Sequence, residues 1–358
     1  MDHSGRIEAV RGLLDEHDVD GLLVTNLTNV RYLTGFSGTN GQVLVTRSTA
    51  VFLVDPRYDA RARTLVDAAE IVIYPNRLTE VLPPQLAAAQ VSRLGVEAGT
   101  VTLATRDDLA TRLEGVELVP VKDLVEGLRR TKETAEIELI REAISISDRT
   151  LAWALDRIAP GVAERDLAID IEVHMRQAGA EGVSFDPIVG SGPLSAHIHH
   201  TASDRTFEKG DLVLLDFGCR FEGYCSDLTR TLVVGPANDE QLRIYSLVLE
   251  AQKAALAAIA PQVVGSECDA VARAVIDGAG HAEHFGHGLG HGVGLDIHEA
   301  PTLNRLSEDV LEPGHVVTIE PGVYLPGVGG VRIEDCVVVT EDGCEVLGSA
   351  PKDTLTEL

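Results

Sequence analysis

The chain has 358 residues, of which 44% are hydrophobic and 24% charged, a composition typical of a globular protein long enough for two domains. Its formal net charge of -26 argues against nucleic acid as a partner, because nucleic-acid binding requires Lys and Arg that neutralise phosphates. No apolar run approaches the roughly 18 residues of a membrane span, and the first residues lack the apolar core of a signal peptide. We therefore expect a cytoplasmic protein that binds neither nucleic acid nor a membrane.

The first 128 residues alternate strand-like and helix-like segments, which predicts an α/β domain with a mixed sheet. This region contains no Gly-x-Gly-x-x-Gly and no Gly-Lys-Ser/Thr motif, so nothing supports a nucleotide site. Its least usual stretch is Asn29 to Gly41, whose glycine and aromatic residues predict an exposed loop. That loop is either a structural turn or a segment that touches the active site.

A helical period begins at Thr131, so we place one domain in residues 1–128 and a second in residues 129–358. In the second domain the order helix, helix, hairpin occurs twice. The predicted helices span residues 131–158, 163–178, 239–260 and 267–277, and the predicted strands span residues 212–217, 227–234, 316–320 and 331–340. Repetition of this size indicates an α+β fold built from two halves that a pseudo-twofold axis relates around one site.

Each predicted hairpin carries two carboxylates in strand positions, where acids are disfavoured. The first hairpin has Asp216 and Asp227, and the second has Glu320 and Glu334. The spacing also repeats, since 320 minus 216 is 104 and 334 minus 227 is 107. Burial of an unpaired carboxylate costs several kcal/mol, so four such acids in sheet positions require cations.

A glycine-rich segment from Phe285 to Glu299 carries three histidines, His287, His291 and His298, among five glycines. Because each glycine destabilises a helix by about 1 kcal/mol relative to alanine, we expect this segment to be irregular and to line a cavity. Eight of the twelve histidines lie between His197 and His298. Imidazoles gathered in this way indicate a metal or a bound anion.

Two divalent ions would neutralise the four carboxylates, and His291 would add one nitrogen ligand. Mostly oxygen ligation with a single imidazole favours Mn²⁺, Co²⁺, Fe²⁺ or Zn²⁺ over copper, and we expect Mn²⁺ first. Two such ions held close together lower the pKa of a shared water, which favours hydrolytic chemistry. Side chains alternate along a strand, so Arg332 projects on the same face as Glu334. Its guanidinium would steady a ligand carboxylate there, or else lie at the surface.

Five segments resemble, in order and spacing, those of the Xaa-Pro aminopeptidase and prolidase family, which has the pita-bread metallopeptidase fold and a creatinase-type N-terminal domain. They are residues 210–218, 226–231, 290–301, 318–324 and 330–335. The resemblance implies that the ligands of two metal ions are Asp216, Asp227, His291, Glu320 and Glu334. It also implies that Glu320 relays a proton, while His199 and His298 bind the substrate carbonyl and the tetrahedral intermediate. His287 and Tyr324 resemble positions that line the family's site, with packing as the alternative role.

The sequence departs from the family at two positions near His199. Leu194 stands where the family often has Asn, and Ile198 stands where Pro commonly precedes the histidine. Because His197 and His200 lie close by, the sequence leaves the choice of the catalytic histidine open among the three.

The resemblance and the intact ligand set predict an Xaa-Pro aminopeptidase that releases the residue before proline from short proline-containing peptides. An Xaa-Pro dipeptidase is the alternative. We expect longer peptides to be cleaved as well as dipeptides, since no second arginine is placed to bind a free proline carboxylate. More distant alternatives are methionine aminopeptidase, a metal-free creatinase-like hydrolase and a binding module without activity. The resemblance also favours a homodimer.

Overall fold

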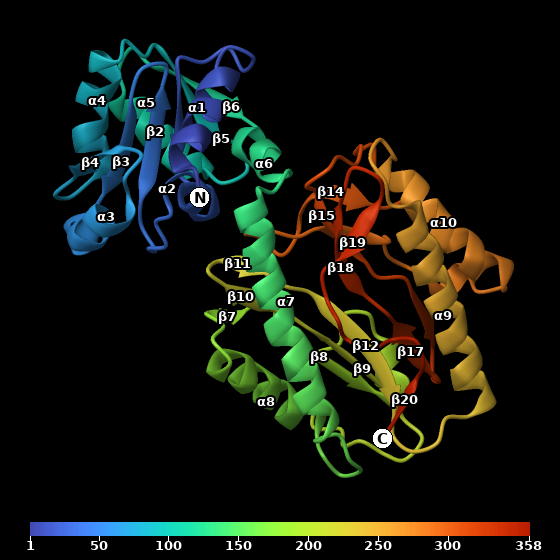
Figure 1. Cartoon of the computed structure of the whole chain (residues 1–358). Coiled ribbons are helices and arrows are strands. Elements are labelled where there is room, and N and C mark those ends of the chain that lie inside the picture. Colours follow the sequence, from blue (N-terminus) through green and yellow to red (C-terminus); the bar gives the residue numbers. More distant parts are fainter. The chain divides into compact units, whose positions relative to one another are not determined.

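The computed structural model describes residues 1–358, which divide into two units, Met1–Arg129 and Arg130–Leu358 (Figure 1). The elements of unit 1 are α1 His3–Leu13, β1 Gly21–Val24, α2 Leu27–Thr34, β2 Gln42–Thr46, β3 Ala50–Val54, η1 Pro56–Tyr58, α3 Asp59–Leu65, β4 Glu70–Ile73, α4 Leu78–Ala88, β5 Arg93–Glu97, α5 Leu103–Arg112, β6 Glu117–Val121 and α6 Leu124–Arg129. The six strands form one sheet in the order β4-β3-β2-β1-β5-β6. Strand β2 is antiparallel to β1 and β3, whereas β4, β5 and β6 join in parallel, as expected of a mixed sheet.

The stretch from Asn29 to Gly41 begins inside helix α2, so the prediction of an exposed loop is wrong for its first part. Asn29 is buried, and its side-chain amide donates to Glu97 and Glu126, both at 2.7 Å. Arg129 in turn donates to the Asn29 side-chain oxygen Oδ1 at 2.8 Å. Most residues of α2 are weak helix formers. The helix therefore depends on contacts made far away in the sequence, which local pattern does not show.

Unit 2 contains a four-stranded sheet, a five-stranded sheet and two small ones (Figure 1). Its elements are α7 Thr134–Leu155, α8 Glu164–Gln177, β7 Gly182–Val183, β8 Ile188–Ser191, η2 Gly192–Ala196, β9 Leu212–Phe217, β10 Cys219–Phe221, β11 Tyr224–Cys225, β12 Leu228–Val233, α9 Asp239–Ala258, α10 Gly265–Gly278, η3 Ala282–His284, β13 Gly290–Gly292, β14 Glu299–Leu303, β15 Val316–Ile319, β16 Gly322–Leu325, β17 Gly329–Arg332, β18 Asp335–Val339, β19 Cys344–Val346 and β20 Thr356–Glu357. The order of two helices followed by an antiparallel strand pair occurs twice, first with β9 and β12 and then with β15 and β18.

The second half differs from the sequence prediction in one respect, because the single strand expected over residues 331–340 is two strands, β17 and β18. The chain leaves β17 after Arg332 and enters β18 at Asp335, so Glu334 lies between them. There the Glu334 N–H donates to the Thr229 carbonyl of β12 at 3.2 Å. Glu334 is thus placed where the chain passes from one sheet to another and meets the first half of the unit.

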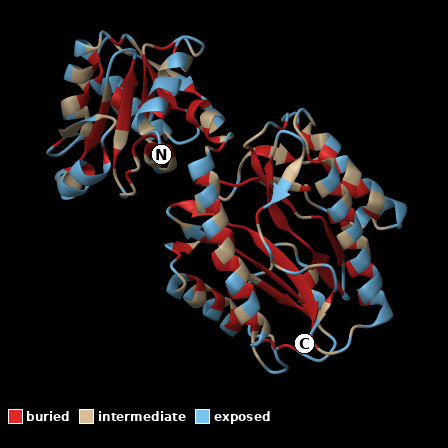
Figure 2. Cartoon of the chain, viewed as in Figure 1, coloured by how far each residue is buried: buried red, intermediate tan, exposed pale blue.

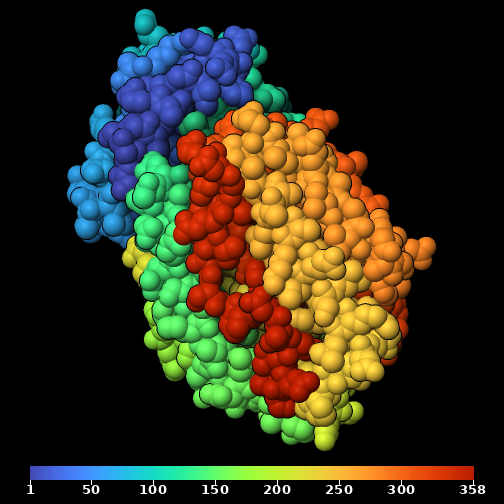
Figure 3. Space-filling model, turned by 45° about the vertical axis from the view of Figure 1, so that its right-hand side comes forward, coloured from blue at the N-terminus to red at the C-terminus, as the bar shows by residue number.

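Each half of unit 2 has its own apolar core. One cluster packs α7 and α8 against β9 and β12, and another packs α9 and α10 against β15 and β18. Figure 2 shows the strands buried and the outer faces of these helices exposed. In Figure 3 the C-terminal segment runs as a stripe between α7 and α9, where Tyr245 donates to the Lys352 carbonyl at 2.8 Å and the Ser349 N–H donates to Asp148 at 2.6 Å. None of the helices combines the length and apolarity needed to span a bilayer.

Candidate active site

Three carboxylates from the two halves of unit 2 meet in the interior. Asp216 belongs to β9, Asp227 directly precedes β12, and Glu334 lies between β17 and β18. One oxygen atom from each lies within 4.8 Å of the others, and all three residues are buried. The register explains the meeting, since Asp216 pairs with Thr229 in the β9/β12 ladder and Thr229 accepts the bond from the Glu334 backbone.

His291 and Glu320 complete the cluster. His291 Nε2 lies 3.6 Å from Asp227 Oδ2 and 3.5 Å from Glu320 Oε1. His291 Nδ1 lies 3.0 Å from the Gly292 carbonyl, which only accepts, so Nδ1 carries the proton. The Nε2 lone pair is therefore left facing the carboxylates, as in a histidine prepared to bind a metal.

Burial and mutual repulsion raise the pKa values of three acids in this cluster. Burial first, and then repulsion from Glu334 and Asp216, raises the pKa of Asp227 well above its usual range. Burial and repulsion from Glu320 and Asp216 raise the pKa of Glu334. Burial, opposed by attraction to Arg332 and reinforced by repulsion from Asp216, raises the pKa of Glu320 to about 7. Asp216 Oδ1 and Glu334 Oε1 are buried and accept no hydrogen bond. Divalent cations would satisfy both the charge and these oxygens, and the oxygen-rich donor set with one imidazole fits Mn²⁺, Fe²⁺, Co²⁺ or Zn²⁺.

Arg332 is the cation that contacts this cluster directly. Its guanidinium donates to Asp216 Oδ2, to the Thr229 hydroxyl at 3.1 Å and to the Tyr324 hydroxyl at 2.8 Å. The side chain is 3% exposed, which excludes the alternative of a surface arginine. Arg332 therefore holds Asp216 in place, and it also lines the cavity described below.

His287 and Tyr324 extend the same hydrogen-bonded chain. His287 Nδ1 lies 2.8 Å from the Gly288 carbonyl, so Nδ1 donates and Nε2 accepts. The Tyr324 hydroxyl lies 2.8 Å from that Nε2 and donates to it, while accepting from Arg332. Burial lowers the pKa of His287 to about 3, which agrees with a neutral ring. The chain thus runs from His287 through Tyr324 and Arg332 to Asp216.

A cavity of about 560 Å³ opens above the cluster. It is lined by Phe185, Asp186, Ile188, Ile198, His199, His200, Thr201, Asp216, Asp227, His287, Gly288, Gly290, His291, His298, Thr302, Asn304, Glu320, Arg332 and Glu334. Nine of the ten site residues expected from the sequence are among them, and the tenth, Tyr324, is not. An apolar patch of Phe185, Ile188 and Ile198 shares the wall with the polar groups, a combination that suits a small organic substrate.

Three further histidines, His199, His200 and His298, line the cavity but are not among the five residues of the cluster. The ring of His298 packs edge to face against that of His291, with centroids 4.3 Å apart. Of the three candidates in the 197–200 segment, His199 and His200 line the cavity and His197 does not. The His200 ring is bound to Glu164 at 2.8 Å. These positions narrow the choice of a substrate-binding histidine to His199 and His200.

Sequence reasoning missed several residues of the wall, namely Phe185, Asp186, Ile188, Thr302 and Asn304. The first three precede or begin β8, and the last two lie in or just after β14. Thr302 lies only four residues beyond His298, so proximity to a candidate site residue was the one signal that could have found it. The residues before β8 carry no such signal.

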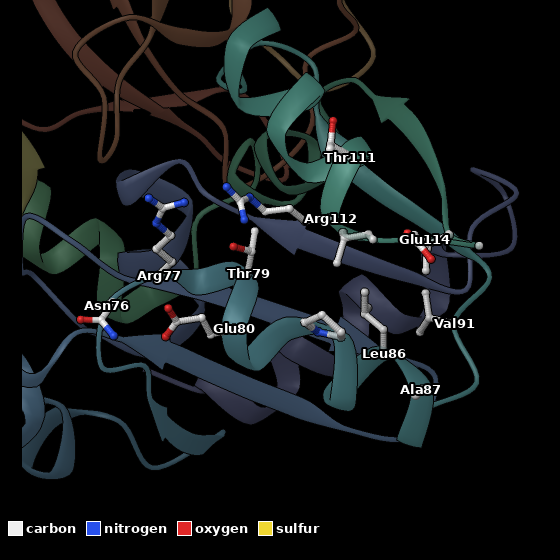
Figure 4. Close-up of a pocket in the computed structure, with 14 residues that line it drawn as sticks. Asn76, Arg77, Thr79, Glu80, Leu86, Ala87, Val91, Thr111, Arg112 and Glu114 are labelled. Carbon is white, nitrogen blue, oxygen red and sulfur yellow. The ribbon is translucent and has the colours of Figure 1, made fainter.

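Unit 1 contains a larger groove, of about 1080 Å³, between α4 and the chain from Thr111 to Val116 (Figure 4). Asn76, Arg77, Thr79 and Glu80 lie at one end, and Leu86, Ala87, Val91 and Glu114 lie at the other. Its charged side chains are exposed, and Arg112 is paired with Asp108 at 2.7 Å. Size therefore does not mark the site of chemistry, because the smaller cavity of unit 2, and not this groove, holds buried acids whose pKa values are raised.

The geometry in unit 2 is that of a metal-dependent hydrolase, and comparison with known proteins narrows it to one family. Residues 138–341 match the model of metallopeptidase family M24, and residues 6–131 match that of the creatinase/prolidase N-terminal domain. The chain belongs to the M24 metallopeptidases. The family recognised from the sequence, and the fold class expected with it, are thereby confirmed.

Three similar proteins cover nearly the whole chain. The solved Xaa-Pro dipeptidase from Bacillus anthracis is 42% identical, covers 100% of both chains and superposes with a TM-score of 0.97. The X-Pro aminopeptidase structure from Thermotoga maritima is 35% identical over 95% of this chain and 98% of its own, with a TM-score of 0.90. The Xaa-Pro dipeptidase of Pyrococcus furiosus is 36% identical over 98% of this chain and 99% of its own length.

Proposed function

We propose that this protein is a metal-dependent Xaa-Pro dipeptidase, which hydrolyses the bond between an N-terminal residue and a following proline. The observation that carries the proposal is the cluster of buried carboxylates, of which Asp216 alone has an arginine partner, beside the open Nε2 atom of His291, in a fold shared along its full length with an Xaa-Pro dipeptidase. The sequence favoured the aminopeptidase reading, with the dipeptidase as the alternative. The names of the similar proteins favour the alternative, while the Thermotoga maritima protein keeps an Xaa-Pro aminopeptidase as the second candidate.

We assign the binding of two divalent ions to five side chains. These are Asp216, Asp227, His291, Glu320 and Glu334. When bound, the ions lower the pKa of a water molecule and polarise the scissile carbonyl, which is the hydrolytic chemistry that the side chains alone lack. We expect Mn²⁺, with Co²⁺, Zn²⁺ and Fe²⁺ as alternatives.

The protein's own groups then act around the reacting atoms. Glu320 accepts a proton from the attacking water and passes it to the proline nitrogen, which must be protonated to leave. His199 and His298 donate hydrogen bonds to the oxygen of the scissile carbonyl as negative charge develops on it. Arg332 keeps Asp216 oriented through the contacts described above, and His287 with Tyr324 keeps Arg332 in place.

The remaining assignments follow the same proposal. The two units correspond to a creatinase-like domain in residues 1–128 and a catalytic domain in residues 129–358. The substrates are short proline-containing peptides, and the protein acts in the cytoplasm as a homodimer.

Substrate length is tested by comparing kcat/KM for Ala-Pro, Ala-Pro-Ala and Ala-Ala-Ala with purified protein supplied with Mn²⁺. We expect strong preference for Ala-Pro. Equal turnover of Ala-Pro-Ala would restore the aminopeptidase reading, and equal turnover of Ala-Ala-Ala would remove the Xaa-Pro assignment. Chelation should abolish activity and Mn²⁺ should restore it, whereas full activity after chelation would favour a creatinase-like hydrolase.

A further inference from the structure

The segment that presents His199 to the cavity is a long connection without regular strand or helix over most of its length. It leaves β8 after Ser191 and extends beyond Ser203, with a short 3-10 turn at its start. Most of this connection has no ladder of backbone bonds, so its position depends on the contacts at its base.

One carboxylate contacts the base at several points, beside a bond from Arg205 to the Ser191 hydroxyl and one from the Arg165 N–H to the Ser203 carbonyl. Glu164, the first residue of α8, is fully buried. At one end of the segment it accepts from the Ser191 N–H at 2.8 Å and the Ser191 hydroxyl at 2.6 Å. At the other end it accepts from the Ser203 N–H at 3.1 Å and the Ser203 hydroxyl at 2.6 Å. Ser191 and Ser203, which flank the histidines of the segment, are therefore tied to one side chain.

The same carboxylate reaches the middle of the segment. His200 Nε2 lies 2.8 Å from Glu164 Oε2 and donates to it, because a carboxylate only accepts. His200 is the next residue after His199, and both line the cavity. The five hydrogen bonds outweigh burial and lower the pKa of Glu164, so the carboxylate is charged. Glu164 contacts none of the five proposed metal ligands in any of these bonds.

We propose that Glu164 is a positioning residue, which fixes His199 in the cavity by binding Ser191, His200 and Ser203 at once. The inference rests on the proposed function, in which His199 binds the scissile carbonyl. The five bonds hold the residues around His199, so a change of their acceptor should shift the His199 ring. Misplacement of a catalytic group by about 1 Å can lower the rate on the order of 100-fold.

The test is Glu164→Gln, which keeps the size of the side chain but replaces one acceptor oxygen by an amide that only donates. That amide would face N–H and O–H groups that also need an acceptor, so the segment must shift. We expect kcat on Ala-Pro to fall at least 10-fold while KM changes less than 3-fold and metal content by elemental analysis stays equal to wild type. The matched control is Glu172→Gln on the same helix, where Glu172 pairs with Arg176 at 3.0 Å near the surface, and it should retain full activity.

A double-mutant cycle separates positioning from general damage. In a His199→Ala background, Glu164→Gln should change kcat less than 2-fold, because its effect acts through His199. Multiplicative losses in the two variants would overturn the proposal. Hydrogen exchange gives a readout independent of activity. Residues 192–203 should exchange faster in Glu164→Gln than in wild type, while the strands β9 and β12 keep their protection.

A milder variant covers the case in which Glu164→Gln does not fold. Ser203→Ala removes one of the five bonds, and we expect a smaller loss of kcat with the same unchanged metal content. Wild-type rates in a soluble Glu164→Gln protein would sink the inference and leave the proposed function intact. Failure of the wild-type protein to hydrolyse Ala-Pro at all would instead sink the proposed function.

Discussion

Two neighbouring carboxylates, Glu334 and Asp335, show how differently unit 2 treats its buried acids. Both are almost inaccessible to solvent. Asp335 accepts from Arg230 at 2.8 Å, from Gln252 at 2.7 Å and from Lys352, and the two cations Arg230 and Lys352 hold its pKa below the usual range despite burial. The Glu334 side chain faces other carboxylates across the cavity floor, and burial with that repulsion raises its pKa.

The difference teaches that burial of an acid does not by itself mark a functional site. Asp269 follows the pattern of Asp335, since it is buried against Arg273 at 2.6 Å and accepts from the Leu289 N–H at 3.0 Å. Those acids are compensated by the protein and hold its parts together. The acids of the cluster are held close against their repulsion by two packed sheets, and this arrangement is expected where an external cation completes the structure.

The strongest test of this comparison is Glu334→Gln. We expect activity to fall on the order of 1000-fold, since even groups that only orient metal ligands contribute about 10- to 100-fold. Metal content should fall with it. In chelated protein the same change should raise the free energy of unfolding in urea, because it removes one of the repelling charges. Loss of stability without metal would show that Glu334 is a structural acid like Asp335.

His298→Ala should show that this histidine has a different role from the acids of the cluster. The ring packs on His291 but offers no bond that holds the cluster together, so both metals should stay bound. We expect kcat to fall by about 100-fold or more, the effect of losing a donor to a developing oxyanion. Kinetics and elemental analysis on one preparation would decide it. Metal loss would mean that the roles of His298 and His291 are exchanged.

The acids of the cluster could be predicted from the sequence because each lies within or directly beside an apolar strand, where periodicity indicates the face on which a side chain lies. Which of the buried acids pair with cations of the protein could not be predicted. Glu334 and Asp335 stand in the same local context, and the cations of Asp335 come from positions 105 and 17 residues away. A local pattern contains no information on such contacts. Their roles as metal ligands stay predictions until metal is measured.

The other features that the sequence did not predict have the same physical origin. Helix α2 depends on contacts between Asn29 and acids 68 and 97 residues away, so its weak local propensity misled the prediction of a loop. Glu164 at the start of a helix has the pattern of an exposed acid that favours the helix N-terminus. Its partners lie 27 to 39 residues further on, and only the fold brings them together.

Asp335→Asn should show the opposite behaviour to Glu334→Gln. The change leaves the buried Arg230 and the partly buried Lys352 without their anion, and breaking a buried pair such as Arg230 with Asp335 costs about 3–5 kcal/mol. Urea unfolding of chelated wild type and variant would measure it. Activity per bound metal should stay near wild type. A variant that loses metal but not stability would contradict the division into two kinds of acid.

A buried base gives the smallest and most specific test. His315 is 2% exposed, and the Glu312 N–H donates to its Nδ1 at 3.1 Å, which requires the neutral ring. Burial, followed by repulsion from Arg130 and Lys132 against a smaller attraction from Asp309, lowers its pKa from 6.5 to about 4. A charge on His315, like the charges on the acids of the cluster, would be buried among groups of the same sign. His315 avoids this by staying unprotonated, not by binding a metal.

The sign of the pH effect follows from this shift. Between pH 6.5 and 4 the unfolded chain binds a proton at His315 that the folded chain does not, so its contribution to stability is complete above pH 6.5 and is lost as the pH falls. Between pH 6.5 and 5 the loss is about 2 kcal/mol. His315→Asn, whose amide oxygen can accept the Glu312 N–H, should lose correspondingly less over the same range. Urea unfolding of both proteins in chelator at pH 7, 6 and 5 measures the difference, and parallel curves would show that His315 is protonated as readily in the fold as outside it.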